Sequence, residues 1–245
     1  MSDRTSPNTS DNGPRRHGSG GSPVPEPAIR RLSLYLRQLE AFQSSGLLTV
    51  SSKQLADPLG FTDAQVRKDL GYFGQFGKPG KGYSVTSMIA TIRKILGTDR
   101  TWNVLLIGVG NLGHALAGYR GFGRKGFRIV AAFDKDPSKV GQPLEAYPSL
   151  RIHPMEQIAE IVRQTDARLA MLAVPAEAAQ PVAEQLAQAG VYGILNFAPV
   201  TLAMPKEVMV NDVDLAVELE QLAFHVSSHP KTEPAQSTHS SDEQG

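Results

Sequence analysis

The sequence predicts two consecutive folds, a winged helix-turn-helix domain and then a Rossmann-type α/β domain with a doubly wound parallel sheet. Residues 24–100 show the order helix, helix, helix, basic glycine-rich hairpin, helix. From residue 101 onward, apolar strand patterns alternate with helical patterns, which is typical of a parallel sheet covered on both faces. The first of those strands runs into the glycine motif GVGNLG, which is typical of dinucleotide-binding folds.

These patterns divide the chain into five segments. We expect a polar tail over residues 1–23, a winged-helix domain over 24–100 and a Rossmann domain over 101–212. A C-terminal helix over 213–227 and a second polar tail over 228–245 follow. Both tails carry few apolar residues, so we expect them to be disordered.

Helical periodicity begins the first domain. Residues 24–46 are predicted to form a helix that opens with prolines. A shorter helix is predicted over residues 51–60, with Ser51 or Ser52 as its cap and an interruption at Pro58. The longer helix should present one apolar face to the core. That face consists of Ile29, Leu32, Leu36, Leu39 and Phe42.

A third helix, over residues 63–74, has a buried face and a charged face. Thr62 and Gln65 have the spacing of a capping box at its start. Its inward residues are Val66, Leu70 and Phe73. Its outer face carries Gln65, Arg67 and Lys68, which can reach base edges and phosphates, with Arg67 suited to guanine and Gln65 to adenine.

The wing lies in residues 76–85, where glycines and Pro79 separate two short stretches. Lys78 and Lys81 lie near its tip, where they suit phosphates or a minor groove. A fourth helix, over residues 87–97, closes the domain.

Charge and composition limit the kinds of molecule that this protein is expected to bind. Residues 24–100 carry a net charge of +5 and residues 101–227 a net charge of −3, so we expect only the first half to meet a polyanion such as DNA. The chain has no Cys, which excludes disulfides, thiolate metal sites and cysteine nucleophiles. No apolar run is long enough to cross a bilayer. We therefore expect a cytoplasmic protein without a membrane or metal partner.

The second domain shows strands alternating with helices. Strands are expected over 103–107, 128–133, 169–174, 192–197 and 208–211, with a weaker one near Arg151 and Ile152. A helix covers residues 175–190, and a last helix carries the apolar stripe Leu215, Leu219, Leu222 and Val226. That stripe is compatible either with exchange between two subunits or with packing on its own subunit.

The glycine motif predicts a pyrophosphate site. In this motif Gly108 permits a tight turn, Gly110 lets the phosphates approach the backbone, and Gly113 lets helix and strand pack closely. The N–H groups at the start of the helix would face the phosphates. The loop that would hold them comprises Gly108, Val109, Gly110, Asn111, Leu112 and Gly113.

An acidic residue follows the second strand, at the distance from the glycine motif that is typical of dinucleotide-binding sites. Asp134 comes about 20 residues after Gly113, where a carboxylate can accept hydrogen bonds from an adenosine ribose. The same charge would repel a 2′-phosphate. The sequence therefore predicts NADH or NAD⁺ as the ligand.

The later strand ends should receive the nicotinamide, and their residues are Val174, Pro175, Asn196 and Phe197. Their apolar surroundings favour the neutral ring of NADH over the cation of NAD⁺. These ends offer no His, Lys or Tyr as a proton donor, which a dehydrogenase usually needs. We therefore favour a nucleotide that acts as a regulatory ligand over one that an enzyme consumes as a cosubstrate.

Two alternatives stay open, an NAD-dependent oxidoreductase with a helical extension and a CoA-binding module. Loss of NADH affinity in an Asp134→Ala variant would argue against the CoA-binding module.

With both halves in place, the chain resembles the Rex family of bacterial redox-sensing transcriptional repressors over almost its whole ordered length. The segments that carry this resemblance are VPEPAIRRLSLYLRQLE, QVRKDLGYFG, GKPGKGY, IGVGNLGHALAGYRGF, FDKDPSKVG, ILNFAPV and VDLAVELEQLAF. The resemblance implies a homodimer whose winged-helix domains bind a palindromic operator and whose Rossmann domains sense the NADH to NAD⁺ ratio. Binding of NADH would release the DNA.

The resemblance also assigns residues. It implies that the last helix is exchanged between subunits, that Tyr119 and Asp214 form a ligand-responsive contact, and that Arg37 is a partner in the other state. One departure concerns the wing, where many family members carry Arg beside the central glycine. This chain has Pro79 there, flanked by Lys78 and Lys81.

Overall fold

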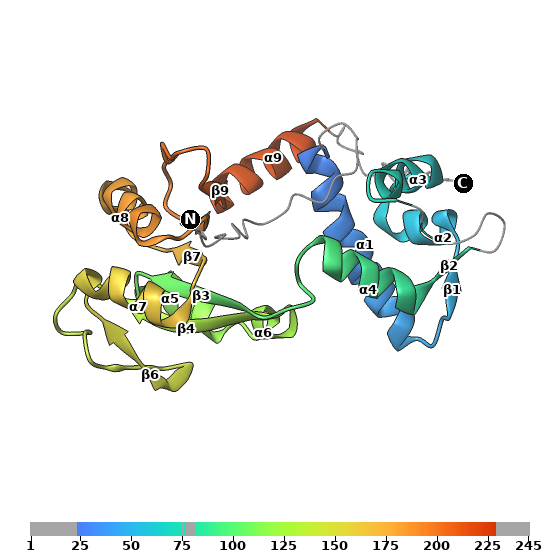
Figure 1. Cartoon of the computed structure of the whole chain (residues 1–245). Helices are drawn as coiled ribbons and strands as arrows, with labels where there is room; N and C mark the ends of the chain where they lie inside the picture. The colour runs from blue at the N-terminus through green and yellow to red at the C-terminus, as the bar shows by residue number, and fades with distance from the viewer. Residues whose placement is uncertain (1–23, 75, 77–81, 229–245) are drawn as a thin grey trace, which may run out of the picture. The chain divides into compact units, whose positions relative to one another are not determined.

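The computed structural model describes residues 24–74, 76 and 82–228, and the chain divides into two compact units, Met1–Arg100 and Thr101–Gly245 (Figure 1). The predicted tails, apart from Ser228, and the wing tip with its two lysines lie outside the described residues. Within the described ranges, no helix has the length and apolar character needed to cross a membrane. The same ranges hold no group of three or more His, Cys, Asp or Glu residues that could bind a metal ion.

The first unit is helical with one short strand pair, as the winged-helix prediction requires. Its helices are α1 (Glu26–Ser44), α2 (Ser52–Ala56), the 3₁₀ turn η1 (Asp57–Leu59), α3 (Asp63–Gly71) and α4 (Val85–Ile95). The strands β1 (Thr49–Val50) and β2 (Tyr83–Ser84) pair antiparallel. The sequence does not predict β1, because two residues are too few to show an alternating pattern.

The helix starts of this unit match the predicted caps, with one exception. Ser51 caps α2 through a reciprocal capping box with Gln54, and Pro58 ends that helix in a 3₁₀ turn. At α3, the Thr62 hydroxyl accepts a hydrogen bond from the Gln65 N–H at 3.1 Å. The second half of the predicted box is wrong, because the Gln65 side chain donates to Asp69 instead.

The core of this unit lies where α1, α3 and α4 meet. The predicted face of α1 is buried at Leu32, Leu36 and Leu39. The prediction for Ile29 is wrong, since its side chain is 44% exposed. Ala28, four residues before Leu32, takes the inward position in that turn and is fully buried.

The second unit is a seven-stranded sheet with helices on both faces. Its strands are β3 (Trp102–Ile107), β4 (Phe127–Phe133), β5 (Pro143–Leu144), β6 (Tyr147–His153), β7 (Leu169–Leu172), β8 (Gly193–Asn196) and β9 (Met209–Asp212). Its helices are α5 (Asn111–Gly118), α6 (Gly121–Arg124), the 3₁₀ turn η2 (Met155–Gln157), α7 (Ile158–Thr165), α8 (Ala176–Ala189) and α9 (Leu215–Ser227).

The strand order β5-β6-β4-β3-β7-β8-β9 confirms the predicted Rossmann topology. All neighbours pair parallel except β5 and β6, which pair antiparallel. Because β4 lies on one side of β3 and β7 on the other, the chain reverses direction across the sheet at β3. Ligands bind at such a reversal, outside the carboxyl ends of the strands.

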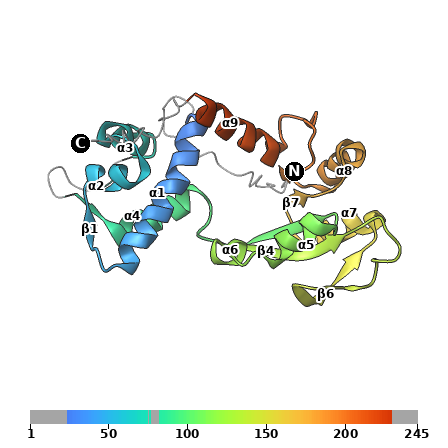
Figure 2. The ribbon, with the colours of Figure 1, turned by 180° about the vertical axis from the view of Figure 1, so that it is seen from behind.

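Alternate side chains of β3 face two separate cores. Leu105 and Ile107 join a cluster with residues of α7 and α8. Val104 and Leu106 join a second cluster with Ala117 of α5. The sheet is therefore buried on both faces, which explains the unbroken apolar run of β3. Figure 2 shows the same elements from behind.

The last helix differs from the others because none of its residues is buried. Its large apolar side chains are between 44% and 71% exposed, and they are Leu215, Val217, Leu219, Leu222, Phe224 and Val226. In the described part of the chain, the stripe predicted on this helix is therefore not covered by its own sheet.

Candidate functional site

The glycine loop leaves β3 between the ends of β4 and β7. The N–H of Gly108 donates to the carbonyl of Phe133 at 2.8 Å, and its φ of +90° lies in the region that favours glycine. A Cβ at Gly108 would collide with the carbonyl of Ala173. A Cβ at Gly113 would collide with the carbonyl of Gly108. Both positions therefore require glycine for the reasons that the motif predicts.

Gly110 behaves differently from the other two glycines. A Cβ there would have nothing within 4 Å, so the fold itself leaves space in front of this residue. Gly110 is also the N-cap of α5 and has no side chain to cap that helix. The free N–H groups of the first turn are therefore available to an anion that enters the space.

Asp134 holds the glycine loop from the end of β4. Its Oδ2 accepts hydrogen bonds from the Val109 N–H at 2.8 Å and from Lys139 Nζ at 3.2 Å. Its Oδ1 accepts a hydrogen bond from the Asp136 N–H at 2.9 Å. A carboxylate offers about four acceptor positions, so the geometry leaves one for a ribose hydroxyl.

The charge of Asp134 is stabilised despite its burial. Burial alone raises the pKa of this carboxyl group, but the N–H groups of Asp136 and Val109 and the ammonium group of Lys139 outweigh that effect. The net pKa lies below its usual value. Asp134 is therefore an acceptor at neutral pH, as ribose binding requires.

A pocket of about 290 Å³ opens beside Asp134. It is lined by Asp134, Lys135, Pro137, Val140, Pro154, Met155 and Glu156. Four of these side chains are apolar and suit a flat ring. Because adenine is attached to the ribose, a ribose on Asp134 would place adenine in this pocket.

The ends of β7 and β8 contribute mostly apolar groups. Val174 and Phe197 are partly buried, and Pro175 begins the approach to α8. Asn196 is fully buried, and its Nδ2 donates to Val200 O and to Asp212 Oδ1, both at 2.8 Å. Its Oδ1 accepts from the Ala198 N–H at 3.0 Å. The structure therefore engages the Asn196 side chain in the loop after β8 and in β9.

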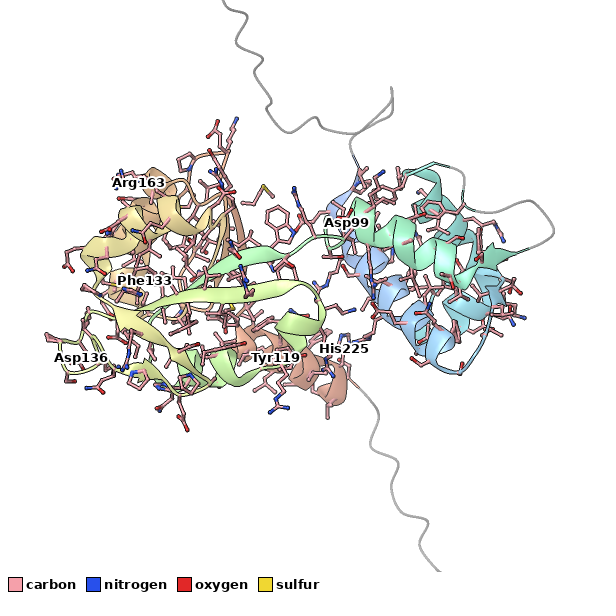
Figure 3. The ribbon with its side chains drawn as sticks, turned by 60° about the horizontal axis from the view of Figure 1, so that its bottom comes forward. Asp99, Tyr119, Phe133, Asp136, Arg163 and His225 are labelled. Carbon is pink, nitrogen blue, oxygen red and sulfur yellow. The ribbon has the colours of Figure 1, made fainter. Side chains whose placement is uncertain are left out.

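The residues that the resemblance assigns to a switch occupy three elements. Tyr119 ends α5, is 57% exposed and packs edge-on against Phe122 at 5.0 Å between ring centroids (Figure 3). Asp214 caps α9, with its Oδ1 accepting from the Ala216 N–H at 2.9 Å. Arg37 is exposed on α1.

The outer face of α3 presents two exposed cations, Arg67 and Lys68. Arg67 forms an exposed ion pair at 2.7 Å with Asp63, one turn earlier. Such surface pairs contribute little to stability, so Arg67 can exchange this partner for another anion. Gln65 has its amide nitrogen on Asp69, a contact that sequence analysis did not foresee.

Sequence reasoning also missed Lys139 and the pocket walls. Lys139 lies five residues after Asp134, and the loop between them is too irregular for a periodic pattern to predict a contact. The pocket joins the loop after β4 to Pro154 and Met155 after β6. Only the parallel pairing of β4 with β6 brings these two segments together.

Family models match both halves of the chain. Residues 99–200 match the family described as "CoA binding domain", and residues 23–71 match the one described as "Putative DNA-binding protein N-terminus". The two matches fall on the two compact units.

Curated relatives extend the similarity over most of the chain. A protein of Carboxydothermus hydrogenoformans named "Redox-sensing transcriptional repressor Rex" is 48% identical over 206 residues, covering 84% of this chain and 98% of that protein. A protein of the same name from Pelotomaculum thermopropionicum is 46% identical over 203 residues, with 83% and 94% coverage.

Solved structures agree with the sequence relatives. A crystal structure of RSP in complex with β-NAD⁺ and operator DNA matches with a TM-score of 0.79 at 33% identity, covering 84% of this chain and 94% of that chain. The structure of RSP in complex with β-NADH matches with a TM-score of 0.75 at 31% identity, with 84% and 96% coverage. From its fold, its glycine loop and these relatives, the chain belongs to the Rex family of redox-sensing transcriptional repressors.

Proposed function

We propose that this protein is a redox-sensing repressor, which binds operator DNA as a homodimer in the cytoplasm and releases it when NADH binds. The observation that carries the proposal is the presence of both parts in one chain. A glycine loop backed by an ionised Asp134 comes after β3, and a helix with outward cations, α3, lies in a separate winged unit. The relative solved with NAD⁺ and operator DNA supports the same pairing of ligands.

On the DNA side, α3 supplies Gln65, Arg67 and Lys68, and the wing supplies Lys78 and Lys81 outside the described residues. Two recognition helices that enter successive major grooves on one face of DNA must stand about 34 Å apart. A repressor that reads a palindrome therefore needs a dimer. The exposed apolar stripe of α9 supports a second copy of the chain as the partner that covers it.

On the nucleotide side, discrimination has to come from the nicotinamide, because NADH and NAD⁺ share every other group. Val174, Pro175 and Phe197 surround the ring position with apolar groups, which favours the neutral reduced ring. NADH then stabilises a dimer whose recognition helices are wrongly spaced. A ligand shifts such an equilibrium only by its preference for one state, with a typical coupling of about 1–3 kcal/mol.

We propose a regulatory rather than a catalytic role for the bound nucleotide. The residues after β7 and β8 begin Ala173-Val174-Pro175 and Phe197-Ala198-Pro199, and none of these side chains can donate a proton to a carbonyl substrate. An NAD-dependent oxidoreductase would turn over an alcohol or a hydroxy acid. We expect no turnover of either class.

The CoA alternative for the sheet unit rests on the name of the matching family model. Asp134 is a poor single discriminator, because its replacement by Ala would also release the Val109 N–H. A competition experiment between CoA and NADH separates the two kinds of site without changing the protein. We expect CoA not to displace NADH from the purified protein, whereas displacement at similar concentrations would favour a CoA site.

A gel shift tests the proposal directly. An operator is first selected from random duplexes with the purified chain, and NADH and NAD⁺ are then titrated separately against the complex. We expect NADH to release the DNA at a lower concentration than NAD⁺ does, because the apolar groups at the ring position favour the neutral reduced ring. Equal effects of the two nucleotides would contradict the proposal.

Matched variants separate the two sites in this assay. Arg67→Ala should weaken DNA binding and leave NADH affinity unchanged. Arg163→Ala removes the same charge from the exposed side of α7 (Figure 3). It should leave both DNA binding and NADH affinity at the level of the unmodified protein.

A further inference from the structure

The inward face of α3 contains a buried carboxylate that the proposed function does not use. Asp69 is fully buried, and its two oxygens accept four hydrogen bonds from protein groups. Its Oδ2 accepts from Arg31 Nε at 2.6 Å and from the Tyr35 hydroxyl at 2.7 Å. Its Oδ1 accepts from Arg31 Nη2 at 2.8 Å and from Gln65 Nε2 at 2.7 Å.

These contacts connect two helices at two points. Arg31 and Tyr35 lie one turn apart on α1, and Asp69 lies on α3. The guanidinium group binds the carboxylate through two of its nitrogens, a geometry that fixes direction as well as distance. The orientation of α3 on α1 is therefore set by a directional polar cluster in addition to apolar packing.

The carboxylate remains charged in this environment. Burial alone raises the pKa of Asp69, but hydrogen bonds from Arg31, Tyr35 and Gln65 more than offset that effect. Burial and the adjacent Asp69 also raise the pKa of Tyr35, so its hydroxyl donates as a neutral phenol. Each partner is thus held in the protonation state that the cluster needs.

The cluster also determines which way the Gln65 amide faces. A carboxylate accepts hydrogen bonds only, so the amide nitrogen has to point to Asp69 and the carbonyl oxygen has to point elsewhere. One N–H of the amide is used in this contact. The oxygen and the second N–H remain, and this donor and acceptor pair is what reads adenine in a major groove.

We propose that Asp69 is a positioning residue for operator recognition, which orients the Gln65 amide to read one base pair. Asp69 is buried and acts through the Gln65 amide. The inference rests on the proposed function, because it requires α3 to enter the operator. It predicts that a buried side chain controls base preference.

The test compares Gln65→Ala, Asp69→Asn and the double variant on a set of operators. In each operator, one base pair is exchanged symmetrically in both half-sites. We expect Gln65→Ala to lose preference at one base pair by about tenfold per half-site, or about 100-fold for the symmetric exchange, within the range of one two-bond side-chain contact in each half-site. Asp69→Asn should lose preference at the same base pair, and the double variant should lose no more than Gln65→Ala.

Two further variants guard against a trivial loss of folding. Arg31→Lys keeps the charge beside Asp69 but loses the planar fork, and it should reduce the same preference to a smaller extent. Ile92→Val removes one methylene group from the core of the same unit. Compared at equal folded fraction, it should keep the full base preference.

The outcomes are distinguishable. An unmodified chain that selects no duplex, or that keeps its DNA in NADH, would contradict the proposed function. An unmodified chain that behaves as a repressor, with unchanged base preference in Asp69→Asn and Arg31→Lys, would overturn the positioning role alone. A lower melting temperature in Asp69→Asn without a change in base preference would show that Asp69 stabilises the fold and does not position Gln65.

Discussion

The three glycines of the loop after β3 differ in what would require a glycine there. Gly108 and Gly113 are required by the fold, because a Cβ at either would meet a backbone carbonyl. Gly110 has open space in front of it, so only an approaching ligand can require it. This difference allows folding and binding to be tested at separate residues of one motif.

We predict that Gly110→Ala leaves the melting temperature of the protein close to that of the unmodified chain and weakens NADH binding by at least about tenfold, or 1.4 kcal/mol. The added methyl group would stand where the pyrophosphate approaches the backbone. Isothermal titration calorimetry with NADH measures the change.

Gly118→Ala is the matched control for this prediction. Gly118 is the last residue of α5, and a Cβ there also has nothing within 4 Å. It lies outside the glycine motif, so NADH affinity should not change. Equal NADH affinity in Gly110→Ala and Gly118→Ala would show that no phosphate approaches Gly110.

At the scale of elements, α9 depends on its N-cap residue. The Asp214 carboxylate accepts hydrogen bonds from the N–H groups of Ala216 at 2.9 Å and Val217 at 3.3 Å. A helix without buried residues gains little stability from packing on its own chain. The cap is therefore a large part of what holds α9 together in the single chain.

Asp214 caps α9, and we propose that it is also a ligand-responsive contact. Two substitutions separate these roles. Asn caps helices about as well as Asp, whereas Ala costs about 1 kcal/mol. We predict that Asp214→Asn preserves dimerisation and alters the NADH concentration that releases DNA, because the charge is lost. Asp214→Ala should weaken dimerisation and also alter the NADH concentration that releases DNA.

Sedimentation equilibrium measures the dimer in these variants, and the gel shift measures release. If Asp214→Asn released DNA at the NADH concentration of the unmodified protein, the charge of Asp214 would have no part in the switch. The capping role would stand in that case, since it depends only on the acceptor oxygen.

At the scale of the whole molecule, the exposed stripe of α9 is the feature on which we expect the oligomeric state to depend. Leu219 is 65% exposed and Leu222 is 59% exposed on the same helix. Burying one leucine side chain stabilises an interface by about 1.5–3 kcal/mol. A two-fold dimer contains each residue twice, so a single substitution there acts twice.

We predict that Leu219→Glu raises the dimer dissociation constant by about 10²–10⁴-fold, which corresponds to about 3–6 kcal/mol over two copies. Operator affinity should fall with it, because a monomer reads one half-site. Sedimentation equilibrium and the gel shift provide the measurements.

Gln221→Glu provides the control, since it adds the same charge at a polar position of the same helix. It should leave the dimer unchanged. A chain that is monomeric without any substitution, or a Leu219→Glu variant that dimerises as well as Gln221→Glu, would contradict α9 as the dimer element.

The sequence by itself determined the order of the main helices and strands and the chemistry of the loop. Leu105 and Ile107 belong to an unbroken apolar run that indicates a strand buried on both faces, and the spacing of Gly108, Gly110 and Gly113 indicates a phosphate-binding turn directly after that strand. These signals are local, because each depends on residues within one turn or one strand. The distance from Gly113 to Asp134 carries similar information, since it spans the rest of α5, the short helix α6 and β4.

Only the tertiary structure decided which partners the polar side chains with non-local contacts take. Gln65 has the spacing of a capping box, yet its amide binds a carboxylate held by Arg31 of another helix. Asn196 ends a strand at the expected ligand face, yet its amide is engaged by Val200 and Asp212. A hydrogen-bonding side chain accepts many partners, and the one that it meets depends on which distant segments the packed core brings within about 3 Å.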